Sequence, residues 1–143
     1  MTTHTHTHTR PATGPTSGTA FGPRAQRAGW VVTALVTAFL GFDAVTHLLQ
    51  VEQVREASAG LGIPDHVIVI CGAVLGSLVI GYLVPATRAM AVVLITAYLG
   101  GAVAVNLIAE QPALNSVFAI LAAVLVWAGA WPRDARLRGL LRA

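Results

Sequence analysis

Two ionisable side chains lie four residues apart within a long apolar stretch of this sequence. Asp43 and His47 would share one face of a helix, because residues at positions i and i+4 are neighbours on a helical surface. A carboxylate so placed can orient an imidazole and stabilise its charged form, which suits hydrogen bonding or proton transfer to a polar group of a ligand. Ionisable residues are costly in an apolar environment, so a functional role is the favoured interpretation, and a self-satisfied packing network is the alternative.

A metal centre is not expected at this pair. Two ligands on one helix are too few for a metal ion, and the apolar stretches lack the carboxylates that a di-iron centre needs. Haem held between His47 and His66 is conceivable. The single cysteine, Cys71, cannot form a disulfide within the chain and is interpreted as a structural thiol.

Four apolar stretches carry these residues, and each is long enough to be a membrane-spanning helix, since roughly 20 apolar residues cross a bilayer core of about 30 Å. The stretches cover residues 29–51, 67–84, 89–108 and 113–131. A water-soluble domain has about a quarter of its residues charged, whereas this chain has 10% charged and 55% hydrophobic residues. The sequence therefore predicts an all-α integral membrane four-helix bundle, with a disordered tail over 1–28, a transmembrane domain over 29–131 and a basic tail over 132–143.

The basic residues indicate how the bundle is oriented. All nine are arginines, and only Arg55 lies between the first and second stretches; the other eight precede the first, follow the second or follow the fourth. Cytoplasmic segments carry an excess of basic residues, so both termini are predicted to be cytoplasmic. The arginines adjoin the membrane without interleaved aromatic residues, which favours contact with anionic lipid headgroups over binding to nucleic acid.

The two terminal segments differ in character. The first 28 residues are rich in Thr, His, Pro and Gly, which is typical of a solvated low-complexity tail. His4, His6 and His8 alternate with threonines there and could chelate a metal weakly. In residues 133–143 leucines alternate with arginines, a pattern that predicts a short helix at the membrane interface.

Depth within the membrane separates the polar side chains into two groups. Counting about 1.5 Å per residue from the middle of each stretch places a carboxylate, an imidazole and two amides in the outer half. The inner half, away from the interface, offers only hydroxyls and one indole. This asymmetry predicts an outward-opening polar pocket between the helices. The candidate ligand-binding residues are Asp43, His47, Asn106, Asn115 and Ser116.

Small residues at four-residue spacing predict where helices approach closely. Gly72 and Gly76 form such a stripe in the second stretch, and Ala97 and Gly101 form one in the third. These stripes could serve the bundle or a homodimer. We expect the first and third stretches to meet, so that His47 and Asn106 face the same interior pocket.

Four sequence segments together resemble the DoxX-like family of small bacterial four-span membrane proteins. They are FDAVTHLL at 42–49, LGIP at 61–64, YLGGAVA at 98–104 and WPRDARLR at 131–138. The resemblance covers about residues 30–141 and implies a four-helix bundle in the bacterial inner membrane. It also implies membrane redox work, since the family's name derives from quinone-reducing subunits of a thiosulfate oxidoreductase. Members often carry histidine where this chain has Asn106, so a mechanism that needs two intramembrane histidines is not supported.

Two functions of different class follow from this resemblance. The first is a redox-linked subunit that binds quinone, in which His47, oriented by Asp43, hydrogen-bonds or protonates the quinone headgroup. The second is a non-catalytic scaffold or assembly factor, in which the polar cluster is structural. The sequence has no Gly-rich dinucleotide turn and no cysteine cluster, so an independent redox enzyme is not expected. Other membrane subunits or a second copy of this chain are the expected protein partners.

Overall fold

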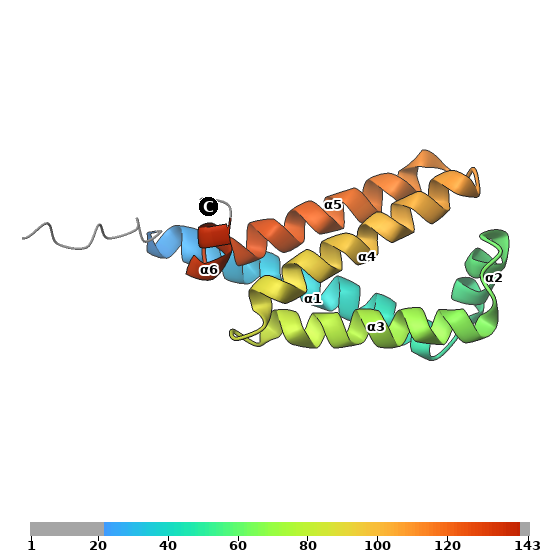
Figure 1. Ribbon diagram of the computed structural model, residues 1–143, viewed down its shortest axis with the longest axis horizontal. Helices are drawn as coiled ribbons and strands as arrows, with labels where there is room; N and C mark the ends of the chain where they lie inside the picture. Colours follow the sequence, from blue (N-terminus) through green and yellow to red (C-terminus); the bar gives the residue numbers. More distant parts are fainter. Residues whose placement is uncertain (1–21, 141–143) are drawn as a thin grey trace, which may run out of the picture.

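The computed structural model describes residues 22–140, and every secondary-structure element in that part of the chain is an α-helix (Figure 1). The four long helices are α1 (Pro23–Leu48), α3 (Asp65–Leu83), α4 (Arg88–Ile108) and α5 (Ala113–Ala130). All four are long and apolar enough to cross a membrane. Two short helices, α2 (Glu52–Gly60) and α6 (Ala135–Leu140), lie at opposite ends of the bundle. The predicted all-α membrane bundle is confirmed.

The long helices form a closed ring in which each packs against two others. α1 packs against α3 and α5, and α4 packs against the same two helices, so α1 and α4 lie diagonally across the bundle. The expectation that the first and third spans pack directly against each other is therefore wrong, but His47 and Asn106 do line one cavity between the helices, as expected. Short connections make consecutive helices antiparallel neighbours, which places the first and third of four on a diagonal. Figure 1 shows the pairs α1/α3 and α4/α5 diverging toward the end that carries α2.

Helix α1 begins at Pro23, within the segment that was expected to be a disordered tail. Proline suits the first helical position, where its missing N–H would have no helical partner. The following turns carry Arg24 and Arg27, which are exposed and polar, so a search for apolar residues alone does not detect them. The histidines of the N-terminal tail lie outside the described residues.

The bundle interior is built mainly from aliphatic side chains, and many other apolar side chains face outward. Leu40, Leu75 and Val126 are at most 2% exposed. On the outer surface Phe42 is 71% exposed and Ile108 is 83% exposed. A bilayer offers these side chains apolar contacts, so the outer surface of the bundle is suited to lipid.

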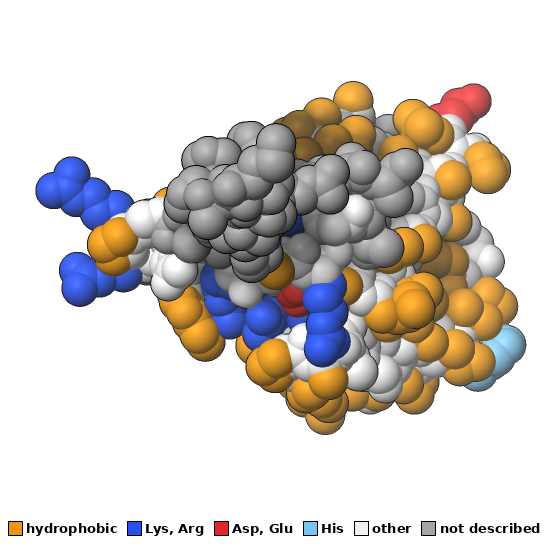
Figure 2. All heavy atoms as spheres, turned by 60° about the vertical axis from the view of Figure 1, so that its left-hand side comes forward, with side chains coloured by type: hydrophobic (Ala, Val, Ile, Leu, Met, Phe, Trp, Pro, Cys, Tyr) orange, Lys and Arg blue, Asp and Glu red, His pale blue; other side chains and the backbone are white. Residues whose placement is uncertain are grey.

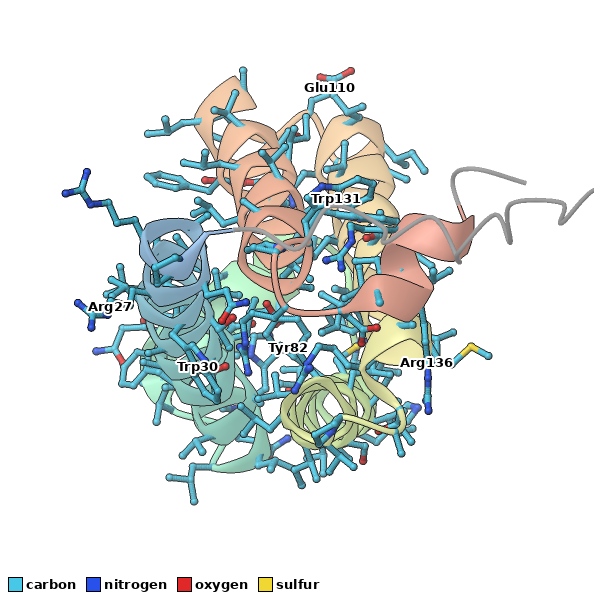
Figure 3. All side chains as sticks on the ribbon, turned by 90° about the vertical axis from the view of Figure 1, so that its left-hand side faces the viewer. Arg27, Trp30, Tyr82, Glu110, Trp131 and Arg136 are labelled. Carbon is cyan, nitrogen blue, oxygen red and sulfur yellow. The ribbon has the colours of Figure 1, made fainter. Side chains whose placement is uncertain are left out.

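One end of the bundle, which we call the basic end, gathers most of the arginines. Figure 2 shows their side chains clustered there, with hydrophobic side chains over much of the adjoining surface. The arginines of this end are Arg24, Arg27, Arg88, Arg133, Arg136 and Arg138. Trp30 and Trp131 lie at this end as well (Figure 3).

A chain of hydrogen bonds closes the bundle at the basic end. Arg133 Nη1 donates to Thr33 Oγ1 at 2.7 Å, and the Thr33 hydroxyl lies 3.3 Å from the Tyr82 hydroxyl. Tyr82 in turn donates to the Val126 carbonyl at 3.0 Å. Because this carbonyl can only accept, the Tyr82 proton is committed to it and Thr33 must donate to Tyr82. Three helices and the segment after α5 are thereby joined around Tyr82, which points into the bundle in Figure 3.

The segment before α6 folds back onto the bundle. Arg88, at the start of α4, lies 3.9 Å from the Asp134 carboxylate, and both residues are 6% exposed. Leu137 of α6 is fully buried in the core. The Arg133 guanidinium stacks 3.5 Å above the Trp30 ring. Burial lowers the pKa of Arg133, and the nearby Arg88 charge lowers it further, but arginine remains charged at physiological pH. A short helix is thus present where the sequence predicted one, and buried contacts anchor it to the bundle.

Candidate functional site

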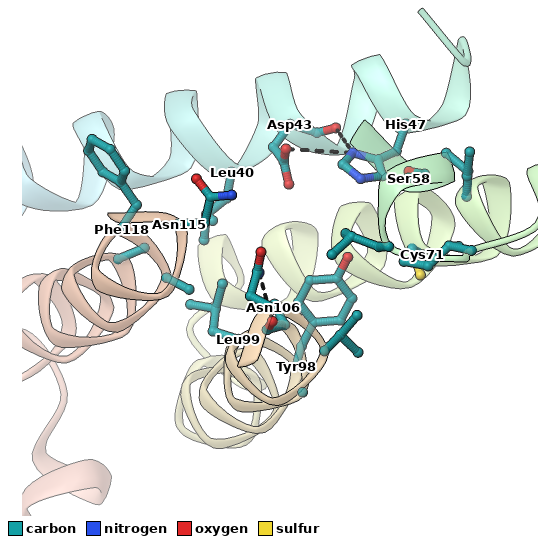
Figure 4. A pocket seen from close by; sticks show the side chains of 18 of the residues that line it. Leu40, Asp43, His47, Ser58, Cys71, Tyr98, Leu99, Asn106, Asn115 and Phe118 are labelled. Carbon is teal, nitrogen blue, oxygen red and sulfur yellow. Dashed lines mark hydrogen bonds and ion pairs between the residues drawn. The ribbon is translucent and has the colours of Figure 1, made fainter. Parts of the chain in front are cut away.

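A cavity of about 540 Å³ lies between the four long helices in the half of the bundle nearest α2. Its apolar wall includes Leu40, Leu99, Phe118 and Phe39. The polar side chains that line it, all labelled in Figure 4, are Asp43, His47, Ser58, Cys71, Tyr98, Asn106 and Asn115. The predicted pocket is thus present, and it brings together residues from helices that are far apart in the sequence.

Helix α2 and the turn after it cover the cavity at its polar end. Ser58, Leu61 and Ile63 contribute to the lining from this side. The turn is held to the α4–α5 connection by a hydrogen bond of 3.3 Å from Gln111 Nε2 to the Gly60 carbonyl. The sequence suggested only a loop here, because α2 is short and polar. The helix makes the connection between α1 and α3 a cover for the cavity.

The imidazole of His47 is oriented by the backbone of α1. Its Nδ1 lies 2.8 Å from the Asp43 carbonyl oxygen and 3.5 Å from the Asp43 carboxylate oxygen Oδ1. A carbonyl can only accept, so Nδ1 carries the proton in this bond. The carboxylate oxygen lies beside the same nitrogen, at a distance too long for a strong hydrogen bond. Among the described residues, none forms a hydrogen bond with His47 Nε2, which leaves this nitrogen available to a ligand.

The backbone of α3 presses against α1 next to this imidazole. A Cβ atom added to Gly72 would lie 2.9 Å from the Ala44 carbonyl oxygen, from His47 Cβ and from the Leu48 amide nitrogen. Side-chain carbons essentially never approach so closely. Because Gly72 has no side chain, α3 and α1 can approach this closely beside His47.

Two asparagines face the imidazole from the other side of the cavity. Asn106 of α4 donates its Nδ2 to the Ala102 carbonyl at 2.8 Å, which leaves its side-chain oxygen uncommitted. Asn115 of α5 lines the cavity, and no described residue hydrogen-bonds its side-chain amide. In Figure 4 the two amides point into the space between α1, α4 and α5. They can therefore accept from or donate to a bound polar group.

Ser116 is the one candidate residue that does not line the cavity. It is 8% exposed and buried in the bundle, but the cavity wall at that height is formed by its neighbour Asn115. Conversely, Tyr98 was not among the candidates although it lines the cavity, with its hydroxyl directed toward Cys71 (Figure 4). Tyr98 precedes Asn106 by two helical turns, so helical periodicity could have indicated that both share a face.

The small-residue stripe of α4 forms cavity wall rather than a helix contact. A Cβ atom added at Gly100 or Gly101 would meet no atom within 4 Å among the described residues. Gly101 lines the cavity instead. Close packing within the bundle is thus confirmed for Gly72 and not for the glycines of α4.

The described residues do not place three metal-binding side chains together. No group of three His, Cys, Asp or Glu residues in positions 22–140 is arranged to hold a metal ion. His66 is exposed on the first turn of α3 and does not line the cavity, so it does not face His47 across it. The side chains that converge here suit hydrogen bonding to an organic group.

The comparisons with known proteins agree with the architecture. The family model for the DoxX-like family matches residues 31–129, which is well over half of the chain and covers α3, α4 and most of α1 and α5. No curated protein and no solved structure matches the chain. The matched region contains the cavity residues from Asp43 to Asn115. On this match the chain, a multi-pass membrane protein, belongs to the DoxX-like family.

Proposed function

We propose that this protein binds the headgroup of a membrane quinone in the cavity and serves as a quinone-associated subunit of a bacterial inner-membrane redox complex. One observation carries the proposal: several polar groups without protein partners converge on a cavity whose remaining walls are apolar. They are His47 Nε2, the Asn106 side-chain oxygen and the Asn115 amide. Polar groups left unpaired away from water are costly, so a ligand that pairs with them is stabilised.

The size and chemistry of the cavity support a quinone as the ligand. Small-molecule sites typically enclose about 300–1,000 Å³ and combine apolar walls with a few polar groups, and this cavity encloses about 540 Å³. A quinone ring presents carbonyl oxygens that accept hydrogen bonds from an imidazolium or an amide, and its flat faces suit the aromatic wall at Phe39 and Phe118. The redox context comes from the family resemblance.

The chemistry of this chain is limited to binding and proton transfer. Reduction of a quinone to a hydroquinone takes two electrons and two protons. Only as an imidazolium does His47 carry a proton on Nε2 as well as on Nδ1, and in that form it could donate the Nε2 proton to a carbonyl oxygen and return to the neutral ring that is protonated on Nδ1. A partner subunit that carries a redox cofactor would have to supply the electrons, and a second proton would come from the outer aqueous side past α2.

The test measures quinone binding by purified protein in lipid nanodiscs. Tail-less and short-tailed ubiquinone and menaquinone analogues should bind saturably and raise the thermal unfolding temperature, because a ligand that binds only the folded state stabilises it. His47→Ala should abolish this effect. His66→Ala is the matched control, since His66 is exposed and outside the cavity, and it should bind as the wild type does.

Two results would contradict the proposal. If the wild type shows no saturable binding of any analogue, the quinone role falls and the scaffold or assembly function replaces it. If His47→Ala unfolds at a lower temperature without ligand and still binds the analogues, the imidazole is a packing residue and not a ligand-binding one.

A further inference from the structure

A second hollow runs along the outside of the bundle between α1 and α5. It encloses about 230 Å³ and is lined only by apolar side chains. From α1 come Leu35, Val36 and Phe39, and from α5 come Phe118, Leu121 and Leu125. Leu35 is 65% exposed and Leu121 is 49% exposed, so the hollow is a groove open to the lipid.

The groove is continuous with the polar cavity. Phe39, Phe118 and Ala122 line both. Helices α1 and α5 are antiparallel, so the groove begins at these shared residues and extends toward the basic end. From Phe118 to Leu125 it is about 10 Å long at about 1.5 Å per residue. One continuous space thus has a polar head inside the bundle and an apolar extension along its surface.

We propose that the ligand carries a single apolar tail, which leaves the cavity between Phe39 and Phe118 and lies in the groove between α1 and α5. This inference rests on the proposed binding of a polar head in the cavity. The phenylalanines are 56% and 54% exposed, so each contributes to the inner wall and to the lipid-facing surface. The other end of the cavity is covered by α2, whose Glu52 and Glu56 are exposed, so a tail that left the cavity there would meet charged side chains.

The direction of the groove indicates that the ligand is not an ordinary bilayer phospholipid. A phospholipid keeps its headgroup at the membrane interface and only its acyl chain at this depth. The groove instead meets the polar groups of the cavity within the span, at the level of Asp43. An amphipathic molecule with a compact head below the interface fits both parts at once.

The test compares analogues that share one quinone headgroup and differ only in tail length. In nanodiscs, a prenylated analogue should bind the wild type more tightly than the tail-less one. Leu35→Trp fills the groove without touching the cavity, so it should remove this tail-dependent gain and leave binding of the tail-less analogue unchanged. Leu94→Trp is the matched control: Leu94 lies on α4, is 44% exposed and lines neither space.

The comparison is a double-mutant cycle in which one change removes the tail of the ligand and the other fills the groove. Any gain in binding that comes only from partitioning of the tail into lipid is the same for both proteins and therefore cancels. We expect a coupling of at least about twofold in the dissociation constant, the lower end of what contacting groups show. If the tail-dependent gain is the same in Leu35→Trp as in wild type, or falls equally in Leu94→Trp, the groove is not a tail site. If even the tail-less analogue fails to bind the wild type, the failure lies with the proposed function.

Discussion

The most informative single residue is His47, because its two ring nitrogens have different tasks. Nδ1 is held by the Asp43 carbonyl at 2.8 Å, and this bond depends on the helix backbone alone. Nε2 faces the cavity. The Asp43 side chain adds a negative charge 3.5 Å away. Asp43 thus fixes the orientation of the ring through its backbone carbonyl, and its carboxylate lies beside the same ring nitrogen.

This division of roles predicts the effect of Asp43→Asn. The substitution keeps the backbone carbonyl, so the ring should stay oriented, but it replaces the carboxylate 3.5 Å from Nδ1 with a neutral amide. We expect quinone analogues to bind about tenfold more weakly, in line with the loss of one interaction with a charged group, while His47→Ala abolishes binding. Titration calorimetry or thermal shift at several pH values measures both. Complete loss of binding in Asp43→Asn, with the fold intact, would show that the carboxylate itself contacts the ligand.

Residue types and their depth could be predicted from the sequence, but their direction around the helix could not. Asn115 and Ser116 have nearly the same depth. Consecutive helical residues point about 100° apart, so only one of the two can face a given cavity. Which one it is depends on how α5 is rotated against α1 and α4, and that rotation follows from the packing of the whole bundle.

At the scale of the helices, the contact between α1 and α3 determines the shape of the site. Gly72 and Gly76 look alike in the sequence as a small-residue pair. In the structure a Cβ atom at Gly72 would lie 2.9 Å from the α1 backbone, whereas one at Gly76 would lie 3.7 Å from Ala44 Cβ, an ordinary contact. Only the first glycine is required by the close approach.

We therefore predict that Gly72→Ala and Gly76→Ala differ in their effects. Gly72→Ala forces α3 away from α1 beside His47, and overpacking of this kind costs about 1–3 kcal/mol of unfolding free energy. Gly76→Ala should change stability by less than about 0.5 kcal/mol. Reversible unfolding in mixed micelles measures both, and ligand binding should fall only in Gly72→Ala. Equal effects of the two variants would contradict the close helix contact.

The span boundaries were predicted well, because hydrophobicity over about 20 residues is a strong signal. The start of α1 and the existence of α2 were missed, since both are polar and a search for apolar runs ignores them. The glycines of α4 were expected to contact another helix, but a four-residue spacing only indicates that small residues share a face. It does not indicate whether that face meets a helix or a cavity.

At the scale of the whole molecule, charge is distributed unequally between the two ends. The basic end carries most of the arginines, whereas the end near α2 exposes Glu52, Glu56, Asp65 and Glu110 with Arg55 among them. Excess basic residues mark the cytoplasmic side of a membrane protein. We accordingly predict that both termini are cytoplasmic and that α2 is on the outer side.

Cysteine labelling in intact cells tests this topology. In a Cys71→Ala background, single cysteines replace Thr3, Gln53 or Ala143. A membrane-impermeant thiol reagent should label Gln53→Cys in intact cells, and the two terminal cysteines only after the membrane is permeabilised. Labelling of either terminus in intact cells would reverse the predicted orientation and place the cover of the cavity in the cytoplasm.

The divergence of the two helix pairs has a consequence for the kinetics of ligand exchange. Hydrogen bonds around Tyr82 join α1, α3 and α5 at the basic end, while the cavity weakens packing in the other half. Opening should therefore begin at the α2 end and leave the basic end intact, as local opening does where buried contacts are fewest. Collective helix motions of this type take microseconds to milliseconds. The residence time of a ligand would then be set by how often α1/α3 and α4/α5 part, with the Tyr82 cluster as the hinge.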